Sequence, residues 1–184
     1  MTPNTHSTPR QFNALARLLH WLMALAILAM LFIGVGMTTS LTWRPWLIDL
    51  HRPLGIAILL LACLRIINRL NHTPPALPDS LPGWQHAAAK LSHILLYALM
   101  IGVPLLGWAS LSAGNWPVTL VPGWDLPAIS PTHSTLYAVF HSTHSVLAWL
   151  MFFVVLGHLA AALMHAWVLR DGVFSTMTGL NQKD

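Results

Sequence analysis

Charged residues are scarce in this chain. Asp, Glu, Lys and Arg make up 8% of the 184 residues, and Glu is absent altogether. An ordinary soluble domain carries about 25% charged residues. A chain with so few charges cannot cover a water-facing surface with polar groups, which excludes a soluble globular protein.

Cysteine is nearly absent as well. The single Cys63 excludes an intramolecular disulfide, a cysteine-ligated iron–sulfur cluster and the C-x-x-C-H attachment of a covalent haem. The nine Lys and Arg residues form no basic patch with interleaved aromatic residues, so no nucleic-acid partner is expected.

What the chain has instead is long apolar runs. Four stretches are apolar enough to cross a bilayer, which takes about 20 residues per helix. They cover approximately residues 15–37, 46–70, 86–111 and 136–169. Because the first run is too long for the core of a cleaved signal peptide, it is expected to be a retained membrane helix. The expected fold class is all-α: an integral-membrane four-helix bundle that forms a single domain over residues 1–184.

The basic residues are distributed unevenly between the two sides of the membrane. With four spans, both termini and the middle connection share one side, which then carries seven basic residues against two on the other. The seven are Arg10, Arg17, Arg65, Arg69, Lys90, Arg170 and Lys183, and the two are Arg44 and Arg52. Because connections rich in Lys and Arg stay in the cytoplasm, both termini are expected to be cytoplasmic.

Histidine is abundant, with 11 copies against nine Lys and Arg together and five acidic residues. His144 and His158 lie 14 residues apart in the fourth span, so they project from one helix face about 21 Å apart along the axis. By depth, His51 matches His144 and His20 matches His158. Since an ionisable residue inside a span is costly and functional by default, we expect two histidine pairs, one in each leaflet.

Paired histidines at two depths favour the binding of two b-type haems. Neutral imidazole is a good iron ligand, and four-helix bundles hold cofactors between facing helices. The predicted ligand pairs are His20 with His158 and His51 with His144. His141 is a competing candidate three residues before His144, but only His144 keeps the 14-residue interval to His158.

A histidine-based metal transporter is the alternative of another class, because imidazole also binds zinc, copper and nickel. A transport path usually needs water and acidic side chains, yet no Asp lies deep in a span and Glu is absent. Two ligand pairs about 20 Å apart also match no single tetrahedral site.

Five short segments stand in an order and spacing that are specific when taken together. They are Leu19-His20-Trp21, Leu50-His51-Arg52-Pro53-Leu54-Gly55, Leu91-Ser92-His93, Gly157-His158-Leu159-Ala160-Ala161-Ala162 and Arg170-Asp171-Gly172-Val173. They resemble the bacterial cytochrome b561 family over most of the chain. The resemblance implies a multi-pass protein of the bacterial cytoplasmic (inner) membrane that exchanges electrons with quinone. It also implies two b-type haems, ligated by His20, His51, His144 and His158.

Two arginines near the predicted ligands are candidates for cofactor binding. Arg17 lies one turn before His20, and Arg52 directly follows His51. A haem propionate is an anion that accepts hydrogen bonds from a guanidinium group. The alternative for each arginine is that its side chain extends to the lipid headgroups.

Two further histidines are candidate cofactor-binding residues. His93 lies in the third span, and His165 lies seven residues after His158. His93 belongs to a polar stripe whose spacing suits a quinone or a propionate site, formed by His86, Lys90, His93 and Tyr97.

The expected function is electron transfer across the membrane by a dihaem b-type cytochrome. One partner is the quinone pool, of the ubiquinone type. The other is an unidentified one-electron donor or acceptor, such as superoxide or a periplasmic redox protein. Quinone oxidoreductase activity and a homodimer are both compatible with the sequence. The chain is expected to be surrounded by membrane lipid. The alternative within this class is a haem-binding membrane anchor subunit of a larger dehydrogenase or hydrogenase.

Overall fold

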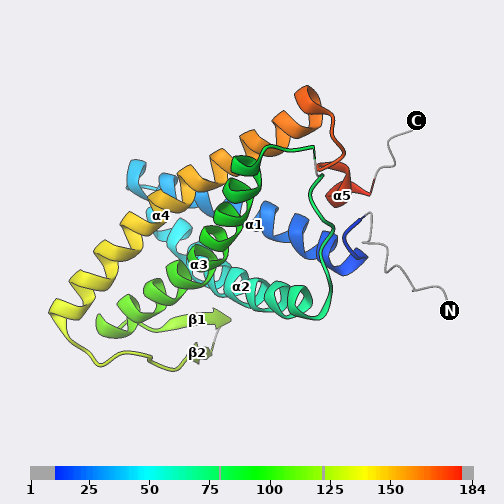
Figure 1. Ribbon diagram of the computed structural model, residues 1–184. Helices are drawn as coiled ribbons and strands as arrows, with labels where there is room; N and C mark the ends of the chain where they lie inside the picture. Colours follow the sequence, from blue (N-terminus) through cyan, green and yellow to red (C-terminus); the bar gives the residue numbers. More distant parts are fainter. Residues whose placement is uncertain (1–10, 79, 122, 180–184) are drawn as a thin grey trace.

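The computed structural model describes residues 11–78, 80–121 and 123–179 (Figure 1). Arg10 and Lys183, which entered the comparison of basic residues, lie outside these ranges. The elements in chain order are α1 (Ala14–Thr39), α2 (Arg44–Asn71), α3 (Gly83–Ala113), β1 (Val118–Val121), β2 (Trp124–Leu126), α4 (Ser134–Leu163), the π-helix η1 (Met164–Leu169) and α5 (Ser175–Thr178).

Four helical segments are long and apolar enough to cross a membrane, namely α1, α2, α3 and the continuous run of α4 and η1. The expected all-α fold with four spans is therefore confirmed. Side chains cap two of these helices at their first turn, where amide groups lack a helical partner. The Asn13 side chain accepts a hydrogen bond from the Ala16 amide at 2.7 Å, and the His133 ring accepts one from the Thr135 amide at 3.2 Å.

The end of the fourth span differs from a plain α-helix. After Leu163 the chain widens into the π-helix η1, and Arg170 then adopts a left-handed conformation with φ of 50°. This turn brings Asp171 back toward the helix, where its carboxylate meets the ring of His165. Short π-helical segments occur frequently at functional sites, and this one carries a predicted site residue.

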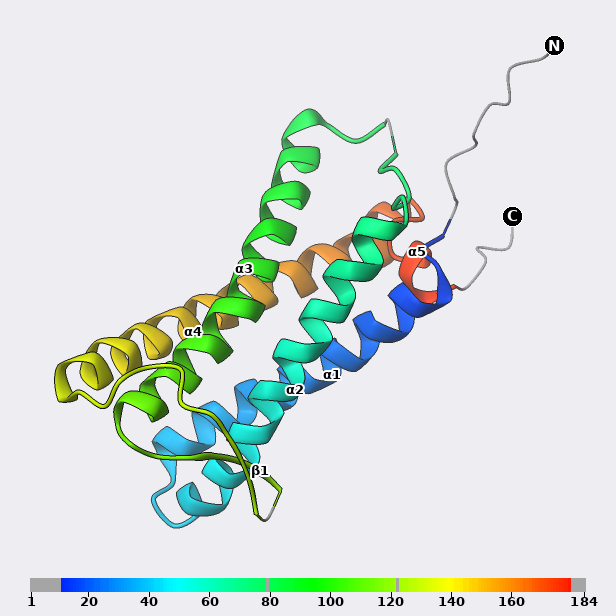
Figure 2. The same cartoon turned by 90° about the horizontal axis from the view of Figure 1, so that it is seen from below.

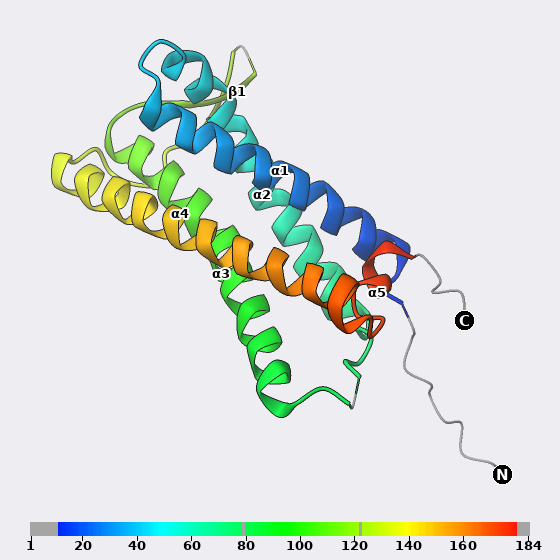
Figure 3. The ribbon, with the colours of Figure 1, turned by 90° about the horizontal axis from the view of Figure 1, so that it is seen from above.

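The helices pack as two neighbouring pairs, α1 with α2 and α3 with α4, and α2 also contacts α3. The first turns of α3 diverge from the other helices in Figures 2 and 3. At one end of the bundle, here called the termini end, α5 lies against the start of α1, and the Phe12 amide donates to the Thr176 carbonyl at 3.2 Å. The antiparallel hairpin of β1 and β2 lies at the opposite end, here called the hairpin end.

The buried core is an apolar layer in the middle of the bundle. It contains Met23, Ile27, Ile58, Ala62, Leu99, Met100, Val103 and Met151. On α4, Met151 lies seven residues from both His144 and His158, so the layer lies between the two histidine levels. Large apolar side chains such as Phe32 and Phe153, exposed by 78% and 63%, cover the outside, as expected of a surface that faces lipid.

Candidate functional site

His51 and His144 face each other at the hairpin end of the bundle. Their ring centres lie 6.0 Å apart, with the ring planes at 74°. The Nδ1 atom of His144 lies 2.9 Å from the Val103 carbonyl oxygen. Because a carbonyl can only accept, Nδ1 carries the hydrogen and the Nε2 lone pair is left free for a metal. The Nδ1 atom of His51 is buried and has no hydrogen-bond partner among the described residues.

A glycine on α3 makes room for the ring of His144. A Cβ atom at Gly107 would lie 3.1 Å from Cε1 and 3.2 Å from Nδ1 of that ring, which is closer than normal contact. Gly107 therefore lets α3 approach α4 closely enough for the Val103 carbonyl to hold the imidazole. The ring sits in a cradle that any larger side chain at this position would partly fill.

The competing candidate His141 points into different surroundings. Its ring stacks on Tyr137, with centres 5.5 Å apart and planes at 17°. Tyr137 in turn packs edge-on against Trp116, at 5.1 Å. No ring contact joins His141 to His51 within the described part of the chain, so the geometry favours His144 as the partner of His51.

Three histidines from three helices meet toward the termini end. The ring of His158 lies 6.4 Å from that of His20 and 5.8 Å from that of His93, with ring planes at 73° and 62°. His20 comes from α1 and His93 from α3, so His158 on α4 contacts rings from two other helices. The structure thus brings together the predicted pair of His20 with His158, and it adds His93 as an immediate neighbour.

The ring separations test whether a bis-histidine metal site fits. With metal–imidazole bonds of about 2 Å, a metal ion between two ring nitrogens sets the ring centres roughly 6 Å apart. The separations of 6.0 Å and 6.4 Å agree with this value. Among the described residues, no group of three or more His, Cys, Asp or Glu side chains is placed to hold one metal ion. The separations therefore suit a two-ligand site such as the iron of a b-type haem.

A cationic cluster borders the termini-end histidines. Arg65 Nε donates a hydrogen bond to the Tyr97 hydroxyl at 3.1 Å. The guanidinium carbons of Arg65 and Arg69 lie 6.0 Å and 5.8 Å from the centre of the Tyr97 ring, within the range of cation–π attraction. Tyr97 follows His93 by one turn of α3, so this cluster and the histidines occupy one side of that helix.

The other predicted arginines have different surroundings. The Arg17 guanidinium donates to the Gln11 side chain at 2.9 Å and packs against Gly179, which directly follows α5. The contact with Gly179 ties Arg17 to the C-terminal segment. Arg52 follows His51 on α2 and forms no ion pair with any carboxylate of the described chain.

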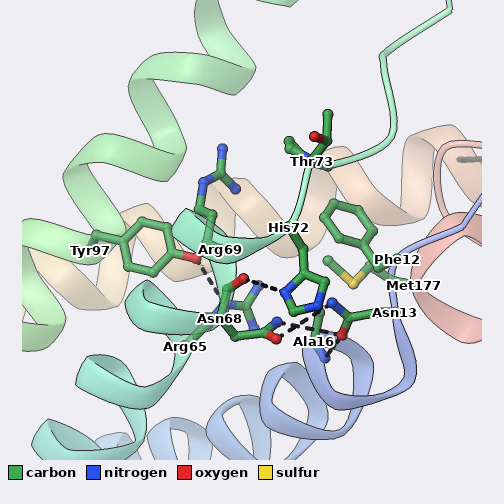
Figure 4. A pocket seen from close by; sticks show the side chains of 11 residues that line it. Phe12, Asn13, Ala16, Arg65, Asn68, Arg69, His72, Thr73, Tyr97 and Met177 are labelled. Atoms are coloured by element: carbon green, nitrogen blue, oxygen red, sulfur yellow. Dashed lines mark hydrogen bonds between the residues drawn. The ribbon is translucent and has the colours of Figure 1, made fainter. Parts of the chain in front are cut away.

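A small open pocket, with a cavity volume of about 30 Å³, lies beside the cationic cluster at the termini end (Figure 4). Its walls come from residues 12–16, from the end of α2 with the loop that follows, from Tyr97 and from Met177. Asn68, only 6% exposed, forms reciprocal amide contacts of 3.4 Å and 3.5 Å with Asn13. Sequence reasoning missed this pocket and Gly107, because both require segments that are far apart in the sequence to meet.

His165 lies outside these clusters and bonds to Asp171. Its Nδ1 atom lies 2.6 Å from Asp171 Oδ2, and both side chains are 14% exposed. The other carboxylate oxygen of Asp171 accepts from the Val173 amide at 3.1 Å. In this arrangement His165 closes the turn after η1, and its predicted contact with a cofactor stays a prediction.

Replacing Asp171 by asparagine is expected to destabilise the protein without removing cofactor. The change removes the charge from a mostly buried hydrogen bond, which costs about 1.5 kcal/mol. Thermal unfolding followed by tryptophan fluorescence should show a lower Tm for Asp171→Asn than for Asp49→Asn, a matched change on α2. Equal Tm values for the two variants would contradict the structural role of this pair.

Comparison with known proteins gives concordant matches. A family model described as prokaryotic cytochrome b561 matches residues 11–180. The chain is 24% identical over 181 residues to cytochrome b561 homolog 2 of Escherichia coli K12, which covers 97% of this chain and 96% of that protein. It is 30% identical over 172 residues to a probable superoxide oxidase of Yersinia pestis, covering 91% and 96%. It is 29% identical over 168 residues to cytochrome b561 homolog 1 of Escherichia coli K12, covering 86% and 92%.

Proposed function

This chain belongs to the prokaryotic cytochrome b561 family, and we propose that it carries electrons across the membrane on two b-type haems, each held by two histidines. It is a multi-pass bacterial membrane protein of the b-type cytochrome class. The proposed ligand pairs are His20 with His158 and His51 with His144. A b-type haem supplies an iron that accepts and releases one electron at a time.

The observation that carries this proposal is the presence of two histidine pairs at two depths. Each pair has the ring separation of a bis-imidazole metal site, 6.4 Å at one level and 6.0 Å at the other. His144 and His158 are about 21 Å apart along α4. The apolar layer around Met151 separates the two levels.

The side chains around each pair would orient the ligands and exclude water. The bond from His144 Nδ1 to the Val103 carbonyl would fix the ring and leave Nε2 free as a ligand atom. The apolar layer keeps ions and water out of the region between the levels. At the termini end, Arg65 would contribute a positive charge beside His20 and His158, where an anionic propionate is favoured.

For the electron partners we propose quinone on one side and a small one-electron donor on the other. The relative from Yersinia pestis, a probable superoxide oxidase, supports superoxide as that donor. In balance, two superoxide anions each lose one electron and leave as dioxygen. One quinone takes up two electrons and two protons and becomes quinol. Which end of the bundle meets this donor depends on the orientation of the chain in the membrane.

We also propose that the termini end faces the cytoplasm. Five of the described basic residues belong to that side, namely Arg17, Arg65, Arg69, Lys90 and Arg170, against Arg44 and Arg52 on the other. An alkaline phosphatase fused to the C-terminus should then be inactive, since that enzyme needs the periplasm to form its disulfides. An active fusion would reverse the orientation.

Optical spectroscopy tests the proposed function directly. The protein purified in detergent should show a b-type band in its reduced-minus-oxidised spectrum, and a pyridine haemochrome assay should count two haems per chain. Stopped-flow mixing with superoxide should then reduce the haem, and mixing the reduced protein with a quinone analogue should reoxidise it. A chain that holds b-type haem but reacts with neither reagent would contradict the proposed partners, and one without a b-type band would contradict the cofactor.

A further inference from the structure

The pocket at the termini end has positive charge that no acidic side chain among the described residues balances. Two of its walls carry the guanidinium groups of Arg65 and Arg69. The only ion pair formed by the described residues joins His165 and Asp171, so neither arginine has a carboxylate partner there. Such a pocket favours an anionic ligand with several oxygen acceptors.

The two arginines differ in whether their guanidinium nitrogens already form a hydrogen bond. Arg65 is partly buried, and its Nε donates to the Tyr97 hydroxyl. Arg69 lies one turn farther toward the helix end, is exposed, and forms no hydrogen bond with any described residue, although its guanidinium lies over the Tyr97 ring. Its terminal nitrogens are therefore free for a ligand that enters from the bundle surface.

Neighbouring polar groups give the pocket a defined shape. The ring of His72 lies against the end of α2, with Nδ1 3.0 Å from the Asn68 carbonyl oxygen. Asn68 is held in turn by Asn13 at the start of α1. Figure 4 shows these side chains and Arg65 pointing into a common space. The pocket is thus built between two membrane helices by contacts that cross the fold.

Two exposed leucines are sequence neighbours of residues that line the pocket, namely Ala16 and Arg69. Leu70 follows Arg69 and is 80% exposed, and Leu15 at the start of α1 is 52% exposed. These leucines lie at helix ends, where the hydrocarbon region meets the headgroups. Basic pockets between membrane helices at this depth bind the headgroups of anionic lipids.

We propose that this pocket binds the phosphate group of an anionic phospholipid, with Arg69 as its principal contact and the acyl chains lying over Leu15 and Leu70. Charge selects the lipid, since a zwitterionic headgroup brings its own cation beside the phosphate. The inference depends on the membrane location of the chain and not on its electron-transfer role.

Native mass spectrometry of the haem-loaded protein in detergent tests this proposal, with phosphatidylglycerol and phosphatidylcholine as probes. Wild-type protein should retain phosphatidylglycerol preferentially. Arg69→Gln should weaken its binding by roughly tenfold or more, the effect of losing a charge-assisted hydrogen bond. Arg44→Gln, the same change at the hairpin end, should leave binding unchanged, and Arg69→Lys should keep part of it.

Several outcomes would overturn the proposal. One is that wild type and Arg69→Gln retain phosphatidylglycerol equally. Another is that wild type retains phosphatidylcholine as well as it retains phosphatidylglycerol. Displacement of the lipid by millimolar glycerol phosphate would assign the pocket to a free phosphate instead. Lipid binding only in protein produced without haem would assign the arginines to a propionate. Circular dichroism and haem content, measured on every variant, show whether each protein is folded.

Discussion

Replacing His144 by alanine is expected to remove about half of the b-type haem from the purified protein, whereas replacing His141 by alanine is expected to remove none. The two residues are one turn apart on α4, but their rings have different partners. His144 faces His51 at 6.0 Å and is held by the Val103 carbonyl. His141 stacks on Tyr137. The pyridine haemochrome assay, expressed per protein chain, measures the difference.

Added imidazole separates a lost ligand from a damaged fold. The alanine variant leaves a space the size of the ring, so free imidazole should restore part of the haem bound by His144→Ala. Loss of haem from His141→Ala with retention in His144→Ala would reverse the assignment. Equal retention in both variants would mean that neither residue is an essential ligand at this level.

The same comparison applies to the three histidines near the termini end. His158→Ala should lose the haem of that level, because its ring contacts both neighbours. If His20 is the second ligand, His20→Ala should lose this haem too, while His93→Ala should retain it with a shifted midpoint potential. The opposite result would make His93 the ligand and His20 the neighbour.

The second large effect is expected at Gly107. Alanine in place of a helical glycine normally stabilises a helix by about 0.5–1 kcal/mol. At Gly107 the added methyl would lie 3.1 Å from the His144 ring and would push it away from the Val103 carbonyl. The lost hydrogen bond lowers the stability by about 1 kcal/mol. The displaced His144 ring is also no longer held in position opposite His51. Gly107→Val, with two more methyl groups, should lose most of the haem at the hairpin end.

Gly102, five residues earlier on α3, provides the matched control. Apart from its own helix turn, a Cβ atom there would meet nothing within 4 Å. Gly102→Ala should therefore keep both haems and melt at an equal or higher temperature, as judged by the loss of the haem absorption band on heating. If Gly107→Val also kept full haem content, the close approach of α3 to the His144 ring would not matter for cofactor binding.

The two histidine levels were predictable because they depend on local properties of one helix. The interval between His144 and His158 is a helical repeat, and the depth of each residue follows from its place within an apolar run. The choice of His144 over His141 also followed from this interval, and the contacts of the two rings agree with it.

Other features could not be predicted from helical spacing and apolar runs. Nothing in the sequence distinguishes Gly107 from Gly102, because the difference lies in which of them faces the His144 ring. Likewise, Asn13 and Asn68 are 55 positions apart and meet only when α1 packs on α2. The contact of Arg17 with the C-terminal segment depends on how the chain turns after η1.

By itself the sequence determined that this protein crosses the membrane four times and carries paired histidines at two depths. Hydropathy and helical period act within a single helix, so no knowledge of the neighbours is needed. The tertiary structure alone decided that His93 joins the pair of His20 and His158, which glycine lies against a ligand ring and where two arginines line one pocket. These depend on how each helix is rotated about its axis, and in lipid an apolar exterior leaves that rotation to the packing of small and polar side chains.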